Sequence, residues 1–293
     1  MNSNLVAHKI TVATFAEKRR NNEAIAILTA YDYTIGRLLD ECGIDAILVG
    51  DSLAMVMLGH VNTLSVTLEE MLHHIRAVRR GVNRALLIGD LPFMSYQVDE
   101  SQALRSAGRL VQEGGVEAVK LEGGRGIANA VRAIVRAGIP VQGHIGLTPQ
   151  SVNMFGGWKV QGRTATAASR LLDDALSLED AGCFSIVIEG VPAQVATHIT
   201  ERLSIPTIGI GAGVGTSGQV LVIHDVLGLC EENQPRFAKR YADLGSNIRE
   251  AANKYRHEVL ARAFPGAEQA YAMSPEEWQI FLNTPSTADG RRG

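Results

Sequence analysis

Cysteine is scarce in this sequence, with only three among 293 residues, at Cys42, Cys183 and Cys230. Three widely spaced cysteines build neither a disulfide framework nor a zinc site, which predicts a reducing compartment. Long apolar runs are also missing. The uncharged stretch at 203–223 is interrupted by five glycines and Pro206, whereas a transmembrane helix needs ~20 mostly apolar residues. The first twenty residues lack the apolar segment of a secretory signal. We therefore expect a soluble, cytoplasmic protein with no membrane partner.

An excess of one charge is absent too. Lysine and arginine total 28 and aspartate and glutamate total 31, which gives a net charge of −3. The chain therefore lacks the broad basic field that non-specific nucleic-acid binding requires, and we expect no nucleic-acid partner. Aromatic residues make up only 5%, but apolar residues reach 46% and charged residues 20%. These last two values are typical of a globular chain and exclude a disordered, collagenous or coiled-coil one.

The sequence contains a regular alternation of short apolar runs and amphipathic helical segments. Eight runs are predicted as strands: Ala24–Thr29, Ala46–Gly50, Ala85–Gly89, Ala118–Leu121, Pro140–Gly143, Ser185–Ile188, Thr207–Ile210 and Val220–Ile223. Most are continuously apolar, as expected of parallel strands buried on both faces. Eight strands in β-α alternation favour a (β/α)8 TIM-type barrel over an open sheet. Too few residues separate the last two runs for a crossover helix, so a glycine-rich loop is predicted there.

Helices are predicted outside the barrel at both ends of the chain. Thr14 opens a capped helix near the start, and Ser274 caps a short one near the end. A longer helix carries Ile248, Tyr255 and other apolar residues on one face. We therefore predict a single catalytic barrel domain at 1–266, terminal helices included, and a partly disordered C-terminal extension at 267–293. The exposed apolar stripes of these helices indicate interfaces, hence a homo-oligomer.

Charged side chains follow the predicted strands at their carboxyl ends, where the active sites of such barrels lie. These residues are Asp51, Asp90, Lys120, Glu122, His144, Glu189, His224 and Asp225. Lys120 and Glu122 are two apart on one strand, so their side chains point the same way. Taken singly, each acid is most simply a cap of the helix after its strand.

Taken together, Asp51, Asp90 and Glu122 indicate a metal site. Three carboxylates from adjacent strands repel one another unless a cation lies between them. Oxygen donors without cysteine favour a hard ion, Mg²⁺ before Mn²⁺ or Ca²⁺. A lysine and a histidine at the same end of the barrel strengthen this interpretation over separate helix caps.

Seven segments together resemble successive motifs of the ketopantoate hydroxymethyltransferase family. They are Thr29–Tyr33, Val49–Ser52, Gly89–Met94, Val119–Gly124, Gly143–Ser151, Phe155–Arg163 and Ile208–Gly213. The resemblance runs in order from about Ala24 to about Phe264, most of the chain. It implies a Mg²⁺-dependent transfer of a one-carbon unit from 5,10-methylenetetrahydrofolate to 2-oxoisovalerate (3-methyl-2-oxobutanoate). The reaction passes through an enolate and gives ketopantoate in pantothenate biosynthesis. The family also implies a homo-oligomer, a decamer built from pentameric rings.

The resemblance also implies a role for each site residue. It implies that Asp51, Asp90 and Glu122 are metal ligands, some of them through water. It implies substrate contacts at Asp51, Ser52, Asp90, Lys120 and His144. It implies that Glu189 is the general base. The exact role of His144 stays open. The chemistry is consistent with these residue types, because a carboxylate can remove the proton beside a ketone once positive charge stabilises the enolate.

Two other functions compete with this one. The nearest is a barrel enzyme of the isocitrate lyase and phosphoenolpyruvate mutase group, which also chelates a 2-oxo acid to Mg²⁺. Its lyases use a cysteine within a Lys-Lys-Cys-Gly-His-type loop, and nothing in this sequence resembles that loop. The second is a non-catalytic barrel that binds a ligand or partner. The loss of an acid from the strand ends would favour it, but all the acids are present.

Overall fold

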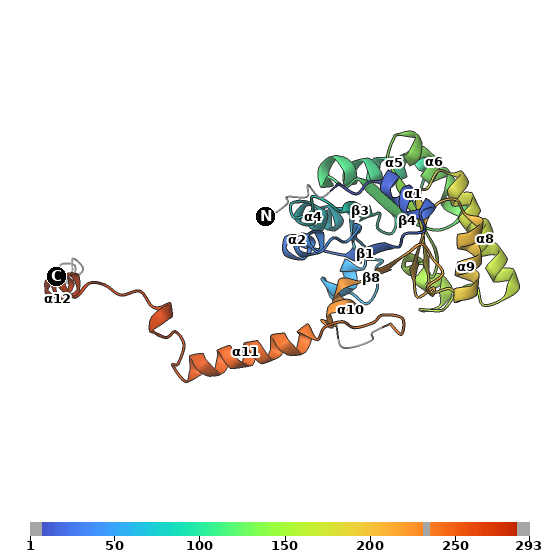
Figure 1. Cartoon of the computed structure of the whole chain (residues 1–293). Coiled ribbons are helices and arrows are strands. Elements are labelled where there is room, and N and C mark those ends of the chain that lie inside the picture. The colour runs from blue at the N-terminus through green and yellow to red at the C-terminus, as the bar shows by residue number, and fades with distance from the viewer. Residues whose placement is uncertain (1–7, 231–234, 286–293) are drawn as a thin grey trace. The chain divides into compact units, whose positions relative to one another are not determined.

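The structure, a computed structural model, describes residues 8–230 and 235–285. Eight parallel strands close into a barrel in sequence order, with β1 pairing both β2 and β8 (Figure 1). The strands are β1 (Ile25–Thr29), β2 (Ala46–Val49), β3 (Leu86–Asp90), β4 (Ala118–Glu122), β5 (Val141–Gly146), β6 (Ser185–Glu189), β7 (Thr207–Ile210) and β8 (Gly218–Leu221). The predicted (β/α)8 TIM-type barrel is confirmed.

The last strand differs from its prediction. The apolar run at 220–223 indicates a strand, but β8 starts two residues earlier and Ile223 instead begins a helix. The reason is backbone pairing, in which Gly218 lies opposite both Ile25 of β1 and Ile208 of β7. A Cβ on Gly218 would collide with the backbone of Ile25. A glycine that no apolar pattern marks therefore begins this strand.

Helices surround the barrel (Figure 1). They are α1 (Val12–Arg20), α2 (Tyr33–Glu41), α3 (Leu53–Val56), α4 (Leu68–Arg79), α5 (Glu100–Arg109), α6 (Ala128–Arg136), α7 (Val152–Phe155), α8 (Ala165–Asp180), α9 (Ala193–Arg202) and α10 (Ile223–Leu227). Three further helical turns, which are not α-helical, are η1 (Leu110–Gly114), η2 (Arg125–Ile127) and η3 (Pro149–Ser151). No helix lies between β7 and β8 among the described residues, so the predicted loop is confirmed.

Side-chain caps set where α1 and α4 begin. The Thr67 hydroxyl accepts from the backbone N–H of Glu70, whose carboxylate accepts from the N–H of Thr67. This reciprocal pair satisfies two N–H groups at the start of α4 that the helix itself leaves free. The predicted start of the first helix at Thr14 is wrong. Thr11 caps α1 three residues earlier, and Thr14 is the third helical residue of the same kind of reciprocal pair.

The interior of the barrel is apolar at the end where the strands begin. Ile25, Leu86 and Val187 belong to one buried cluster that also contains Phe15 of α1. Phe15 contacts Phe184 edge to face, with 5.6 Å between the ring centroids. Because Phe184 directly precedes β6, α1 closes this end of the barrel. The outward side chains of the strands pack against the helices in a second, larger cluster. Polar side chains are therefore left for the opposite end, where the strands finish.

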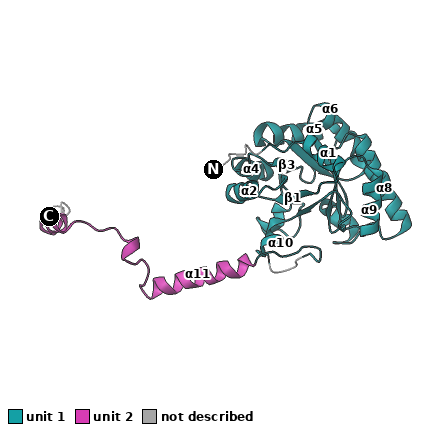
Figure 2. Ribbon diagram, viewed as in Figure 1, with its two compact units in different colours: residues 1–242 teal, residues 243–293 magenta. Residues whose placement is uncertain are grey.

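The chain divides into two compact units, residues 1–242 and 243–293 (Figure 2). The second contains α11 (Leu244–Leu260), η4 (Ala267–Gln269) and α12 (Pro275–Asn283), and Ser274 caps α12 as predicted. The predicted domain boundary at residue 266 stays a prediction, and the part of the predicted disordered tail beyond residue 285 lies outside the described residues. Across the described chain, no helix has the length and apolarity to cross a bilayer.

Candidate active site

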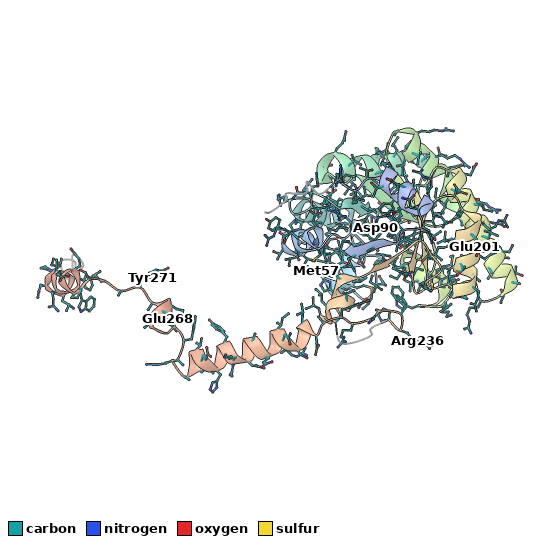
Figure 3. All side chains as sticks on the ribbon, in the orientation of Figure 1. Met57, Asp90, Glu201, Arg236, Glu268 and Tyr271 are labelled. Carbon is teal, nitrogen blue, oxygen red and sulfur yellow. The ribbon has the colours of Figure 1, made fainter. Side chains whose placement is uncertain are left out.

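Six ionisable side chains predicted from the sequence come together at the carboxyl ends of five neighbouring strands. Asp90 ends β3 opposite Lys120 of β4, and Glu122 of β4 lies opposite His144 of β5. Asp51 lies two residues after the end of β2, and Glu189 ends β6. All are buried except Glu189, which is partly exposed. Figure 3 shows Asp90 among the crowded side chains of the barrel.

Lys120 connects the acids of this cluster. Its ammonium nitrogen Nζ lies 2.8 Å from Asp90 Oδ2 and 3.8 Å from Glu122 Oε1. Burial alone would lower the pKa of Lys120, but the negative charges of Asp90 and Glu122 outweigh it and raise that pKa. The lysine is therefore held in its charged form, with its positive charge directed at the centre of the cluster.

His144 lies between the central acids and the predicted base. Its Nδ1 is 3.3 Å from Glu122 Oε1 and 3.4 Å from Nζ of Lys120. Its Nε2 is 3.2 Å from Glu189 Oε2, close enough for an ion pair but not aligned for a hydrogen bond. Burial and the charge of Lys120 lower the pKa of His144, but the two glutamates outweigh them and raise it to about 9. The imidazole therefore links Glu189 to the cluster.

The acids of the cluster outnumber its positively charged groups, Lys120 and His144. Burial, followed by the charges of Asp90 and Glu122, raises the pKa of Asp51 well above its ordinary value. Burial raises the pKa of Asp90 as well, despite the opposing charge of Lys120. Burial also acts to raise the pKa of Glu122, but His144 and Lys120 outweigh it and lower that pKa. A bound cation would relieve the repulsion at the two aspartates.

The free oxygens of the two aspartates are suited to such a cation. Asp90 uses Oδ2 to accept from Lys120 and from the backbone N–H of Asp51, while its Oδ1 is buried without a hydrogen-bond partner. Asp51 uses Oδ2 to accept from Gln150. An unpaired buried carboxylate oxygen is costly, so it fits a hard metal ion as its partner.

Glu122 differs from the aspartates because the protein engages both its oxygens. Oε2 accepts from the backbone N–H of Gln150, and Oε1 lies near Lys120 and His144. Consistent with this, no three His, Cys, Asp or Glu side chains lie close enough together to hold one metal directly in the part of the chain that the structure describes. The donor set thus fits an ion held directly by Asp51 and Asp90, with Glu122 reached through water.

Helix capping does not account for two of these acids. The residue before α3 is Ser52, and no side chain caps that helix. Likewise α9 begins after Pro192 without a side-chain cap, so Glu189 does not serve it. The interpretation of Asp51 and Glu189 as helix caps is therefore wrong, and their places at the strand ends need another reason.

The sequence did not predict the roles of several polar neighbours. The hydroxyl of buried Tyr31 lies 2.8 Å from Oγ of Ser52, a predicted substrate contact. Gln150 and Tyr96 contact the acids themselves. Tyr31 and Gln150 lie inside segments that carry the family resemblance, which was a usable signal, whereas nothing in the sequence marks Tyr96.

His224, expected beside the eighth strand's end, lies within α10, where its ring packs 5.5 Å from that of Tyr31. Asp225 occupies the same helix and is largely buried. Neither residue contacts Asp51, Asp90 or Glu122. The structure therefore does not bring these two into the acid cluster.

Gly146 sets the direction in which the chain leaves β5 beside Glu189. Its φ is +93°, and a Cβ there would collide with the carbonyl oxygen of Glu189. We expect Gly146→Ala to destabilise the protein by about 1–3 kcal/mol or more, because the cost of a positive φ for alanine and the cost of the collision add. Urea unfolding followed by circular dichroism measures this change.

Gly108 provides the matched control for that prediction. It lies in α5, and a Cβ there would meet no atom within 4 Å. Gly108→Ala is expected to stabilise the protein by about 0.5–1 kcal/mol, since alanine loses less backbone entropy in a helix. Equal effects of the two substitutions would refute the argument from Gly146.

A closed β/α barrel with buried acids, a lysine and a histidine at the carboxyl ends of its strands defines a barrel enzyme. The family model described as ketopantoate hydroxymethyltransferase matches residues 9–267. The protein belongs to this family. The resemblance seen in the sequence is thereby confirmed.

Relatives in this family match most of the chain. A 3-methyl-2-oxobutanoate hydroxymethyltransferase of Oleidesulfovibrio alaskensis is 56% identical over 270 residues, 92% of this chain and 93% of its own. One of Syntrophus aciditrophicus is 52% identical over 271 residues, 92% of this chain and 100% of its own. Because coverage is high in both directions, the similarity extends over nearly the full length of these relatives.

Solved structures similar to this chain include a named member of the competing group of barrel enzymes. Phosphonopyruvate hydrolase has a TM-score of 0.57 at 11% identity, covering 94% of this chain and 95% of its own. 2,3-Dimethylmalate lyase, a member of the PEP mutase/isocitrate lyase superfamily, has a TM-score of 0.55 at 16% identity, covering 91% and 92%. At such identities the likeness establishes the shared fold alone.

Proposed function

We propose that this enzyme transfers a hydroxymethyl group from 5,10-methylenetetrahydrofolate to 3-methyl-2-oxobutanoate, giving ketopantoate for pantothenate biosynthesis. The observation that carries the proposal is identity of 52–57% to relatives named for this reaction, over about nine tenths of the chain. The cluster of Asp51, Asp90, Lys120 and Glu122 supports it, because a 2-oxo acid offers the ketone and carboxylate oxygens that such a site binds.

Magnesium would be held by Asp51 and Asp90 through their free oxygens, with Glu122 contributing through water. The unpartnered Oδ1 of Asp90 supports this assignment, and Mg²⁺ usually keeps several waters beside one or two carboxylates. When bound, the ion would act as a Lewis acid toward the ketone oxygen and as a template for the substrate.

Lys120 and Ser52 would hold the 2-oxo acid. Lys120 is buried and charged, so its Nζ can donate to a substrate oxygen on which negative charge develops. Ser52 follows Asp51 directly, and its hydroxyl is fixed by Tyr31 at 2.8 Å. Together they would direct the carbon beside the ketone toward Glu189.

Glu189 would act as the general base. It is the partly exposed carboxylate of the cluster, and no helix uses it as a cap. It would take the proton from the carbon beside the ketone, and the electrons of the broken C–H bond would form the enolate. Water would add to the methylene carbon of the folate, and both bonds from that carbon to folate nitrogens would break, with one proton going to each nitrogen. The formaldehyde so formed would bond to the enolate carbon, and its oxygen would take the proton from Glu189 to become the hydroxyl group.

His144 would support that proton transfer. Its Nε2 lies beside Glu189 Oε2 and its pKa is raised to about 9. His144 would thereby hold the Glu189 carboxylate in place while its Nδ1 remains 3.3 Å from Glu122 Oε1.

The direct test incubates the purified protein with 3-methyl-2-oxobutanoate, Mg²⁺ and 5,10-methylenetetrahydrofolate, and measures ketopantoate by mass spectrometry. Ketopantoate should accumulate only with all three present. Incubation with phosphonopyruvate or 2,3-dimethylmalate tests the competing group of enzymes. Turnover of either, without ketopantoate formation by the folded protein, would overturn the proposal. The cytoplasmic location expected from the sequence stays a prediction.

The oligomeric state follows from the same proposal. We expect a homo-oligomer, a decamer of about ten times the chain mass of 31.5 kDa. The C-terminal unit supports an assembly, because Trp278 and Phe281 of α12 and Tyr255 of α11 are exposed within it. Light scattering coupled to size exclusion measures the mass, and a value near that of a single chain at assay concentration would contradict the prediction.

A further inference from the structure

Gln150 joins the ends of three strands in the acid cluster. It lies in η3, just after β5, and its side chain is buried. Its Nε2 donates to Asp51 Oδ2 at 3.0 Å and to the carbonyl of Leu91 at 2.9 Å. Its backbone N–H donates to Glu122 Oε2 at 2.9 Å. One residue therefore holds two of the three acids proposed to carry the metal.

The orientation of the Gln150 amide is determined by its partners. The carbonyl of Leu91 can only accept, so the nitrogen must face it, and the second N–H then points at Asp51. On the other side, Oε1 accepts from the hydroxyl of Tyr96 at 2.7 Å and from Nε2 of Gln97 at 3.1 Å. All four hydrogen-bonding positions of the amide are used, so it cannot rotate without losing buried bonds.

This arrangement decides which acid oxygens remain available. The amide occupies Oδ2 of Asp51 and leaves Oδ1, and the backbone N–H occupies Oε2 of Glu122. We propose that Gln150 is a positioning residue of the metal site, whose side-chain amide directs one Asp51 oxygen to the cation. The inference rests on the proposed function, and specifically on its magnesium site.

Tyr96 is the second member of this arrangement. Its hydroxyl accepts from the backbone N–H of Glu122 at 3.1 Å and lies 2.9 Å from the carbonyl oxygen of the same residue. It also lies 2.7 Å from Oε1 of Gln150. Because Tyr96 is buried, its removal leaves Gln150 Oε1 with fewer partners and loosens the amide.

The test measures Mn²⁺ binding by electron paramagnetic resonance, without substrate, on folded protein. Gln150→Met has nearly the same size but cannot donate to Asp51, and it is expected to bind Mn²⁺ roughly 10–100-fold more weakly. Tyr96→Phe is expected to weaken binding by up to about tenfold. Gln150→Asn keeps an amide too short to reach both partners, and it tests the same point if the Met variant does not fold.

Gln142 provides the matched control. It is equally buried, on β5, and donates to Ser185 rather than to an acid of the cluster. Gln142→Met is expected to lose comparable stability and to bind Mn²⁺ as wild type does. If Gln150 acts through Asp51, Gln150→Met should weaken Mn²⁺ binding much less in the Asp51→Asn variant than in wild type. A purely structural role predicts instead that the two losses of Mn²⁺ affinity add.

The outcomes separate this inference from the site on which it rests. The role of Gln150 is overturned if wild type binds Mn²⁺ and both Gln150→Met and Gln150→Asn bind it with an affinity within about twofold of wild type. That result leaves the proposed metal site intact. Failure of wild type itself to bind Mn²⁺ overturns both. Weakened binding in the Gln150 variants with unchanged binding in Gln142→Met supports the inference.

Discussion

Glu189→Gln is expected to slow the exchange of substrate hydrogen with solvent by roughly 10²–10⁴-fold, the usual contribution of a general base. Glutamine keeps the size of glutamate and much of its hydrogen bonding but cannot accept the proton. With 3-methyl-2-oxobutanoate and Mg²⁺ but no folate, proton NMR in deuterated water follows the loss of the hydrogen beside the ketone. Binding of 3-methyl-2-oxobutanoate and of Mg²⁺ should remain nearly normal, because Glu189 is neither a proposed substrate contact nor a proposed metal ligand.

Glu201 offers a control for this substitution. It is an exposed acid near the end of α9, labelled in Figure 3, and Glu201→Gln should exchange like wild type. Both variants are first checked for folding by circular dichroism. If Glu189→Gln exchanges as fast as wild type, the base lies elsewhere and the proposed role of Glu189 is refuted.

Asp90→Asn is expected to weaken Mg²⁺ and 2-oxo acid binding together, by roughly 100-fold or more, which corresponds to about 3 kcal/mol. The substitution removes a proposed ligand oxygen and also the carboxylate that pairs with Lys120 at 2.8 Å. Since both partners are buried, leaving the lysine with only its more distant acid should also lower stability, by about 3–5 kcal/mol at most. Calorimetric titration measures both affinities, and thermal unfolding measures the stability.

Metal removal tests the same site without a substitution. Excess chelator should abolish ketopantoate formation, and added Mg²⁺ should restore it. Asp180→Asn is the control for Asp90→Asn, because Asp180 is exposed on α8 and pairs with Arg132 at 2.6 Å. It should leave metal binding unchanged. Full activity in excess chelator would exclude the proposed magnesium site.

The sequence predicted the barrel and the place of its acids for one physical reason. Buried parallel strands are continuously apolar, and the strand ends of a closed barrel all meet at one face. Asp90, Glu122 and Glu189 therefore had to converge once their strands were recognised, and they do. The sequence did not predict that α1 closes one end of the barrel, because the apolar character of Phe15 does not reveal that its partner is Phe184.

Errors arose where pairing outweighed local pattern. β8 begins at Gly218, although the apolar run starts at residue 220, because backbone hydrogen bonds to two neighbouring strands need no apolar side chain. In the same way, Thr11 and not Thr14 caps α1, since both threonines satisfy the pattern and only the path of the chain selects between them.

By itself the sequence determined the fold, the family and the set of charged residues at the strand ends, because apolar periodicity and motif order are local properties of the chain. Tertiary structure alone decided which oxygens of those residues remain free. Gln150 reaches Asp51 across 99 residues and Tyr96 across 54, and His144 lies between Glu122 and Glu189. Such contacts depend on how loops from different strands pack over the barrel. Hydrogen-bond distances of about 3 Å have no counterpart in the spacing of residues along the chain.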